Sequence, residues 1–415
     1  MPDYARNKKF FSASTLLMLV IAACLSLSLI WHEPVPDAWR VPLTLALTLF
    51  SLCITSMRVL VTRLPDLPFA FVRAGGYVSS AFLALFLLVI LRDASLGVFW
   101  LLGESFTALA GAREAAFSTL RSVPFELGML AGGFGLAAVG MALASRVPAV
   151  REVLVPVPKL PDELEGLRLV VVSDLHIGSS SDGRWLAEVV KRANACRPDF
   201  VLMPGDLADG SLVRMENELR PLADLRASYG VLASPGNHDY YSGLPAWVEK
   251  WRSWGLGVLL NVHQDFRVRG RLVRVAGVTD KCARLLPDWQ DGMGPPDLRR
   301  ALSVPVGVAS AAPTPSTAAP LPADVTFLLS HRPEIAAESA ANGVDLQISG
   351  HTHGGQFFFL FPLVSHLNRG FRAGLYRVGT MPLYVSPGTG MWGYAPMRLG
   401  SRAEISLLVL TQFRS

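Results

Sequence analysis

The chain has 415 residues, more than one domain normally uses, so two parts are expected. Hydrophobic residues make up 51% of the sequence, charged residues only 17%, and the mean hydropathy is +0.37, which excludes an ordinary soluble protein. The net charge of +5 is mild, and the basic residues cluster beside apolar runs, which indicates membrane topology rather than a nucleic-acid surface.

The apolar excess lies before about residue 146 and contains four runs of the length that crosses a bilayer, about 20 residues. They are Phe10–Trp31, Val41–Val61, Ala74–Leu91 and Leu127–Ser145. A buried core helix is the alternative for each run, but four runs in one stretch favour membrane spans. A less apolar stretch, Ala94–Ala112, carries Glu104 and predicts an interfacial or re-entrant element.

Basic residues in the short connections predict the orientation, because they favour the cytoplasmic side. They flank the first run, the second connection and the end of the fourth run: Arg6, Lys8, Lys9, Arg58, Arg63, Arg73, Arg146, Arg151 and Lys159. The other two connections hold fewer or more widely spread basic residues: Arg40, then Arg92, Arg113 and Arg121. We therefore expect a multi-pass protein of the inner (plasma) membrane with both termini cytoplasmic. If Ala94–Ala112 spans, the second half changes sides.

Basic residues before the first apolar run also fit a signal peptide. No small-x-small cleavage site follows near Trp31 and further apolar runs come after it, so an uncleaved helix is favoured. Four isolated cysteines fit neither a disulfide framework nor a zinc knuckle.

From Arg168 onward, short apolar runs alternate with amphipathic stretches, which is typical of α/β units. The predicted strands are Leu169–Ser173, Phe200–Met203, Val231–Ala233, Val325–Leu329, Val344–Ile348 and Ile405–Leu410, with a hairpin of Leu375–Val378 and Leu383–Ser386. Helices over Trp185–Cys196 and about Arg214–Ala227 link the first three strands. An Ala/Pro-rich segment at about 305–322 predicts a flexible insertion.

Metal-capable side chains follow these strands in five short motifs. They are Asp174-Leu175-His176, Gly205-Asp206, Gly236-Asn237-His238-Asp239, His331 and Gly350-His351-Thr352-His353. Loops at the carboxyl ends of parallel strands meet at one edge of a sheet, so we expect these side chains to converge. Each residue alone fits a cap or a turn. Together, imidazoles and carboxylates in turns favour a two-metal hydrolytic centre. The motif glycines predict tight turns.

With its motifs in this order, the chain from about Leu164 to Leu410 resembles the calcineurin-like metallophosphoesterase superfamily. More narrowly, it resembles the bacterial membrane-anchored branch with N-terminal transmembrane helices. The resemblance implies an α/β fold, a four-layer α/β/β/α sandwich preceded by a bundle of about four transmembrane helices. The implied domains are 1–150, transmembrane, and 151–415, phosphoesterase.

The resemblance also implies a ligand set for two divalent metal ions, Mn, Fe or Zn, with Mg as a further option. One metal would be bound by Asp174, His176 and His353, the other by Asn237, His331 and His351, and Asp206 would bridge the pair. His238 matches the position that contacts the phosphate and protonates the leaving oxygen. Asp239 would orient the His238 ring through a hydrogen bond.

The function expected from this resemblance is hydrolysis of a phosphodiester or pyrophosphate bond by a membrane-anchored enzyme. A lipid-linked substrate suits the membrane anchor, and relatives in lipid A synthesis hydrolyse UDP-2,3-diacylglucosamine. The alternatives are a catalytically silent sensor or scaffold on the same fold, and a nucleotide or nucleic-acid phosphodiesterase. Specific nucleic-acid binding is not predicted.

Two further features leave alternatives open. Arg332, directly after His331, either touches the phosphate of the substrate or faces solvent. The run Phe357–Phe361 predicts a buried strand, and the alternative is an apolar lip near the site that dips into the membrane.

Overall fold

The computed structural model describes residues 8–31, 35–63, 69–178, 181–285, 292–306, 322–392 and 396–412. Two compact units make up the chain. The helical unit comprises Ala5–Leu143 with Tyr394–Met397, and most of the other unit is Ala144–Gly393 with Arg398–Ser415. Most of the predicted insertion at about 305–322 lies outside the described residues.

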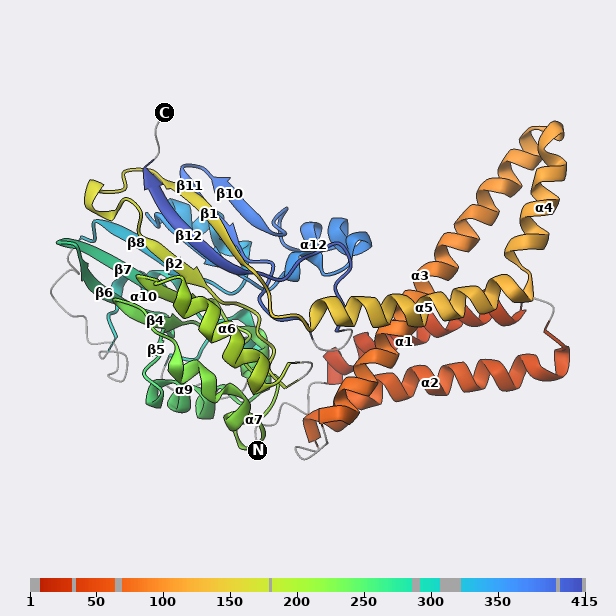
Figure 1. Ribbon diagram of the computed structural model, residues 1–415, viewed down its shortest axis with the longest axis horizontal. Coiled ribbons are helices and arrows are strands. Elements are labelled where there is room, and N and C mark those ends of the chain that lie inside the picture. The colour runs from red at the N-terminus through yellow and green to blue at the C-terminus, as the bar shows by residue number, and fades with distance from the viewer. Residues whose placement is uncertain are drawn as a thin grey trace. The chain divides into compact units, whose positions relative to one another are not determined.

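The helical unit contains long apolar helices (Figure 1). They are α1 (Lys8–Ser26) with a π-helical turn (Leu27–Trp31), α2 (Asp37–Arg63), α3 (Phe69–Ser105), α4 (Ala110–Leu120) and α5 (Val123–Ala144). By length and composition, three described segments could cross a membrane: Asp37–Ile54, Ala70–Ser105 and Val123–Ala144. About four spans were expected, and among the described residues three helices qualify, with Met18–Trp31 of the first apolar run as a shorter apolar helix.

The predicted separate element at Ala94–Ala112 is wrong, because α3 continues without a break to Ser105. The expected loop around Arg92 is helical for the same reason. Arg92 is buried and bonded to neighbouring helices, so its charge does not end the helix. With 37 residues, α3 is about 55 Å long, well beyond the roughly 30 Å of a hydrocarbon core. It must tilt or extend past the bilayer.

The second unit is built on two six-stranded sheets. The first has the order β1 (Val150–Val157), β12 (Ile405–Gln412), β2 (Arg168–Val171), β3 (Phe200–Met203), β4 (Gly230–Ala233) and β5 (Gly257–Val258). The second has the order β10 (Gly374–Val378), β11 (Met381–Val385), β9 (Leu346–Ser349), β8 (Val325–Leu329), β7 (Arg271–Gly277) and β6 (Val262–Val268). Neighbours β2, β3 and β4 run parallel, as do β7, β8 and β9.

Alternate residues of each strand face two different cores, which defines the layers. Leu169 and Phe327 belong to a core between the sheets, whereas Val170 and Leu328 belong to cores under helices. The helices are α6 (Gly183–Ala195), α7 (Leu212–Leu219), α8 (Asn237–Tyr241), α9 (Leu244–Ser253), α10 (Leu298–Ser303), α11 (Ala336–Ala341) and α12 (Phe361–Leu367). Figure 1 shows α6 and α9 along the outer face of the first sheet. The predicted four-layer α/β/β/α sandwich is confirmed.

Helix α6 illustrates how the sequence builds these layers. The Asp182 carboxylate caps the helix by accepting a hydrogen bond from the Trp185 amide, 2.9 Å away. Leu186, Val189, Val190 and Ala193 then follow at helical spacing and are buried against the first sheet. This packing fixes the strand ends at which the motif residues lie.

The prediction of a buried strand over Phe357–Phe361 is wrong. Only Phe357 of this run is buried, at 1% exposure. A single 3-10 turn (Phe358–Leu360) follows and leads directly into α12. Proline at position 362 suits the first turn of a helix.

Candidate metal centre

The five motifs lie directly after β2, β3, β4, β8 and β9, at the carboxyl ends of these strands. Their side chains converge on one place, although up to about 180 residues separate them in the chain. Five of the seven predicted ligands have left-handed backbone conformations, with φ between 47° and 70°: Asp174, His176, Asp206, His351 and His353. Such conformations are unfavourable for residues other than glycine and collect at functional sites.

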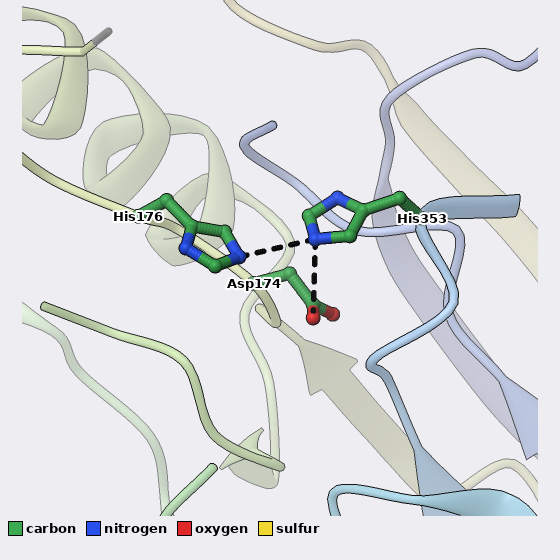
Figure 2. Close-up of side chains that lie close together, drawn as sticks. All are labelled: Asp174, His176 and His353. Atoms are coloured by element: carbon green, nitrogen blue, oxygen red, sulfur yellow. Dashed lines mark hydrogen bonds and ion pairs between the residues drawn. The ribbon is translucent and has the colours of Figure 1, made fainter. Parts of the chain in front are cut away.

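The first group of side chains consists of Asp174, His176 and His353, which point toward one another in Figure 2. The Nε2 atoms of His176 and His353 lie 3.0 Å apart, and His353 Nε2 is 3.7 Å from Asp174 Oδ1. All three residues are buried. Two imidazole nitrogens and a carboxylate oxygen thus face a common point.

The second group consists of Asp206, His331 and His351. His331 Nε2 lies 3.2 Å from Asp206 Oδ2 and 3.2 Å from His351 Nδ1. The same Asp206 oxygen is 3.5 Å from His176 Nε2 in the first group. The Asp206 carboxylate therefore lies between the two groups.

Asn237 joins the second group through Arg332. Asn237 Oδ1 accepts a hydrogen bond of 3.1 Å from Arg332 Nη2, and Arg332 Nη1 lies 2.6 Å from His351 Nε2. The Arg332 Nε donates to Asp280, 2.7 Å away. Of the two alternatives for Arg332, facing solvent is wrong, since its side chain is 18% exposed and turned into the cluster.

The His238 ring is held by Asp209, a residue that we did not predict for the site. Asp209 Oδ1 lies 2.7 Å from His238 Nδ1 and 3.0 Å from His176 Nδ1. One carboxylate thus orients both rings. Asp209 lies three residues after Asp206 in the same loop, and this position in the sequence could have indicated that it belongs to the site.

The predicted hydrogen bond from Asp239 to the His238 ring is wrong. The Asp239 carboxylate accepts hydrogen bonds of 2.8–3.1 Å from four backbone amides, those of Gly236, Asp206, Leu207 and Ala208. It is fully buried and pins the loop after β3 to the loop after β4. Its place at the start of α8 turns the carboxylate toward amides rather than toward the neighbouring ring.

Two of the motif glycines allow these loops to touch. A Cβ atom on Gly205, whose φ is +99°, would lie 2.4 Å from the Gly236 amide nitrogen. A Cβ atom on Gly350 would lie 2.3 Å from Asp174 Oδ2. Only glycine permits such an approach, which agrees with the prediction from the motifs.

The charges in the cluster depend strongly on one another. Burial disfavours a charged imidazole, but the surrounding carboxylates, chiefly Asp209, raise the pKa of His176 to about 9. Burial likewise lowers the pKa of His331, but the Asp206 carboxylate outweighs burial and raises that pKa to about 9. Burial disfavours ionised Asp206, yet the neighbouring histidines hold its pKa well below the usual range. A cation that binds at neutral pH would therefore displace protons from these two imidazoles.

The donor set fits a pair of divalent cations. Within each group, one atom per residue lies within 4.8 Å of the corresponding atoms of the other two residues. The Nδ1 atoms of His176 and His331 face Asp209 and the Pro204 carbonyl, which turns each Nε2 toward the cluster. Imidazole with carboxylate suits Mn, Fe or Zn.

Comparisons with known proteins agree with this geometry. Residues 167–355 match the family model of calcineurin-like phosphoesterases. A Danio rerio protein named transmembrane protein with metallophosphoesterase domain is 36% identical over 284 residues, which cover 67% of this chain and 60% of the relative. The Bos taurus protein of that name is 36% identical over 285 residues, covering 66% and 60%. An uncharacterized metallophosphoesterase of Campylobacter jejuni is 30% identical over 313 residues, covering 75% and 76%. The chain thus spans about three fifths of the vertebrate relatives.

Proposed function

The chain belongs to the calcineurin-like metallophosphoesterase family, and on this premise we propose that it is a membrane-anchored, dinuclear-metal phosphoesterase. One observation carries the proposal. Asp206 Oδ2 lies 3.5 Å from His176 Nε2 and 3.2 Å from His331 Nε2, so one carboxylate faces both groups of ligands. A shared carboxylate is what two neighbouring dications need to offset their repulsion.

The proposed ligands keep the division expected from the sequence. Asp174, His176 and His353 would hold one cation, and Asn237, His331 and His351 would hold the other, with Asp206 available to both. Bound divalent cations would supply Lewis acidity and lower the pKa of water toward neutrality. The neutral Asn237 amide keeps the site more positive toward an anionic phosphate than another carboxylate would.

His238 is the proposed proton donor to the leaving oxygen. Its Nδ1 atom is fixed by Asp209, so Nε2 is the atom left to face a substrate. Because the same Asp209 oxygen also holds His176, the proton donor and one ligand share a single support. Asp239 maintains the loop that carries His238 and stays outside the chemistry.

Arg332 is the proposed contact to a non-bridging phosphate oxygen. Asp280, itself 2% exposed, fixes the guanidinium at the edge of the second group. A fixed, planar guanidinium matches the geometry of phosphate better than a lysine would.

The proposed substrate is a phosphodiester or pyrophosphate, with a lipid-linked molecule such as UDP-2,3-diacylglucosamine as a candidate by resemblance. Three apolar helices of spanning length support membrane anchorage, and two relatives are named transmembrane proteins. We propose the inner (plasma) membrane as the location. The basic residues after the last span, Arg146, Arg151 and Lys159, support a cytoplasmic phosphoesterase unit.

Full-length protein purified in detergent tests this function. With added Mn, it should hydrolyse bis-p-nitrophenyl phosphate. The Asp206→Asn variant should lose bound metal, and its rate of hydrolysis should fall on the order of 1,000-fold. Glu249→Gln on α9 is a control with the same loss of a charge and should behave as wild type. Absence of turnover with Mn, Zn, Fe and Mg would favour the silent scaffold instead.

A further inference from the structure

An apolar surface follows immediately after the last metal-binding motif. Phe358, Leu363 and Leu367, on the 3-10 turn and α12, are 60%, 52% and 64% exposed. Helix α12 has no fully buried residue. Most apolar side chains of this unit fill three cores, whereas these three neighbouring ones are exposed together.

The chain around this surface carries only one sign of charge. Between Asp345 and Glu404 the sequence contains no aspartate or glutamate. The segment contains five arginines, of which Arg369, two residues after Leu367, is exposed. Apolar anchors in a stretch of sequence that has basic residues and no acidic ones match an anionic lipid surface.

This apolar surface is joined rigidly to the metal-binding turn. Arg372 Nη1 donates to the Gly354 carbonyl at 2.8 Å, and its guanidinium lies 3.9 Å above the Phe361 ring. The Thr352 hydroxyl donates to the Arg372 carbonyl. A Cβ atom on Gly355 would lie 2.6 Å from the Phe361 ring. Whatever binds α12 is therefore held within a few residues of His353.

The covalent connection keeps a membrane within reach. Helix α5 ends at Ala144 and β1 begins at Val150, so the connecting residues span at most about 20 Å. Arg192 Nη1 on α6 donates to the Val147 and Pro148 carbonyls, 3.0 Å away in each case. The connection is thus fastened to the folded unit rather than hanging free of it.

We propose that Phe358, Leu363 and Leu367, together with the neighbouring Arg369, dock on the anionic surface of the membrane that the chain spans. Docking would hold the metal-binding turn at the lipid headgroups, so that a lipid-linked phosphoester enters from the bilayer. This inference rests on the proposed phosphoesterase function for its substrate, while the contact with lipid stands on its own observations.

Photo-crosslinking of the full-length chain tests the contact. Leu363 is replaced by p-benzoylphenylalanine, and the protein is reconstituted in vesicles of phosphatidylethanolamine and phosphatidylglycerol. Val213, an apolar residue on α7 that is 92% exposed, is the matched control position. Irradiation should give a lipid adduct, seen as a mass increase, at position 363 and none at 213. Replacing phosphatidylglycerol by phosphatidylcholine should lower the yield several-fold.

Two results would overturn the inference: equal lipid adducts at both positions, or an adduct at 363 with protein, whether the same chain or a second copy. A functional arm separates the two proposals. Leu363→Glu should lower the hydrolysis of a lipid-embedded phosphodiester at least several-fold relative to that of bis-p-nitrophenyl phosphate, and Val213→Glu should leave this ratio unchanged. If wild type hydrolyses neither ester yet forms the lipid adduct, the phosphoesterase proposal fails and the docking surface stands.

Discussion

The two units of the molecule arrange their apolar and polar side chains in opposite ways. In the phosphoesterase unit, Asp174, Asp206 and Asp239 are buried at strand ends, and apolar side chains fill the layers behind them. In the helical unit, Leu49 and Leu127 are 61% and 60% exposed, as suits a lipid environment. Each unit nevertheless buries charge, and the partners of that charge differ.

Arg92 is the buried charged residue of the described part of the helical unit. Its guanidinium bonds to Glu126 at 2.7 Å, to the Ser28 carbonyl at 3.0 Å and to Asp93 at 3.0 Å. These partners complement the arginine and link α3 to α5 and to the turn after α1. In the phosphoesterase unit, by contrast, imidazole nitrogens face each other at 3.0 and 3.2 Å. Complementary partners indicate a structural role, whereas like groups facing one another indicate a ligand site.

The largest effect should come from His238→Ala, which removes the proposed proton donor. We expect kcat for bis-p-nitrophenyl phosphate to fall about 10²–10⁴-fold with metal content unchanged. Asp209→Asn should reduce activity less, by about 10–100-fold, because both the His238 and the His176 rings remain and lose only their shared support. Elemental analysis beside kinetics checks both variants, and loss of metal from the His238 variant would contradict the assigned role.

Asp239→Ala should be next, with an effect on stability. It leaves four buried backbone amides without their acceptor, and the free energy of unfolding should fall by about 3 kcal/mol. Thermal unfolding in detergent measures this change. Asp224→Ala, at an exposed carboxylate 4.0 Å from Arg226, is the control and should stay within about 0.5 kcal/mol. A wild-type melting temperature for Asp239→Ala would show that the loops do not depend on this carboxylate.

Removing metal should affect the phosphoesterase unit moderately. Asp239 and the loop glycines hold the turns through protein contacts, so we expect circular dichroism to be retained in excess chelator. Stability should fall by about 2.7 kcal/mol relative to protein with free metal at a hundred times its dissociation constant. Collapse of secondary structure on chelation would mean that the site is not preorganised.

Apart from the controls, Arg92→Met should have the smallest effect. This variant tests whether Arg92 stabilises the helical unit. We expect a loss of about 1–3 kcal/mol in the stability of that unit, because Glu126 and Asp93 lose their cation. The kcat/KM for the soluble ester should stay as in wild type. Arg113→Met, which breaks the half-exposed pair with Glu104, should cost less than about 1 kcal/mol. Altered kinetics of the Arg92 variant would show that its cluster has a functional role.

The sequence predicted those strands that consist of one uninterrupted apolar run. Phe200–Met203 and Val325–Leu329 are uninterrupted apolar runs, and both strands have the predicted bounds. Strands β6 and β7 were not predicted, although Asp265 and Arg267 alternate with apolar residues, which is the pattern of a half-exposed strand. Their pairing, from Val262 with Gly277 onward, depends on the turn at Arg269 and Gly270.

Tertiary contacts explain the incorrect predictions. Asp239 directly follows His238 in sequence, yet the start of α8 turns its carboxylate toward backbone amides, and Asp209 takes the expected role. Arg92 suggested the end of a span, but its partners lie 34 and 64 residues away. Composition identified the apolar run at Phe357 but could not show that Phe357 alone is buried and that Phe358 is 60% exposed.

The left-handed conformations of Asp174, His176, Asp206, His351 and His353 predict which substitutions would accumulate in relatives that lose hydrolytic activity. Each such position carries a conformational penalty of about 1–2 kcal/mol for most side chains, which aspartate, asparagine or glycine reduces. A descendant released from selection for hydrolysis would gain by replacing these histidines with glycine or asparagine. Such replacements at these positions would therefore mark degenerate paralogues before any assay.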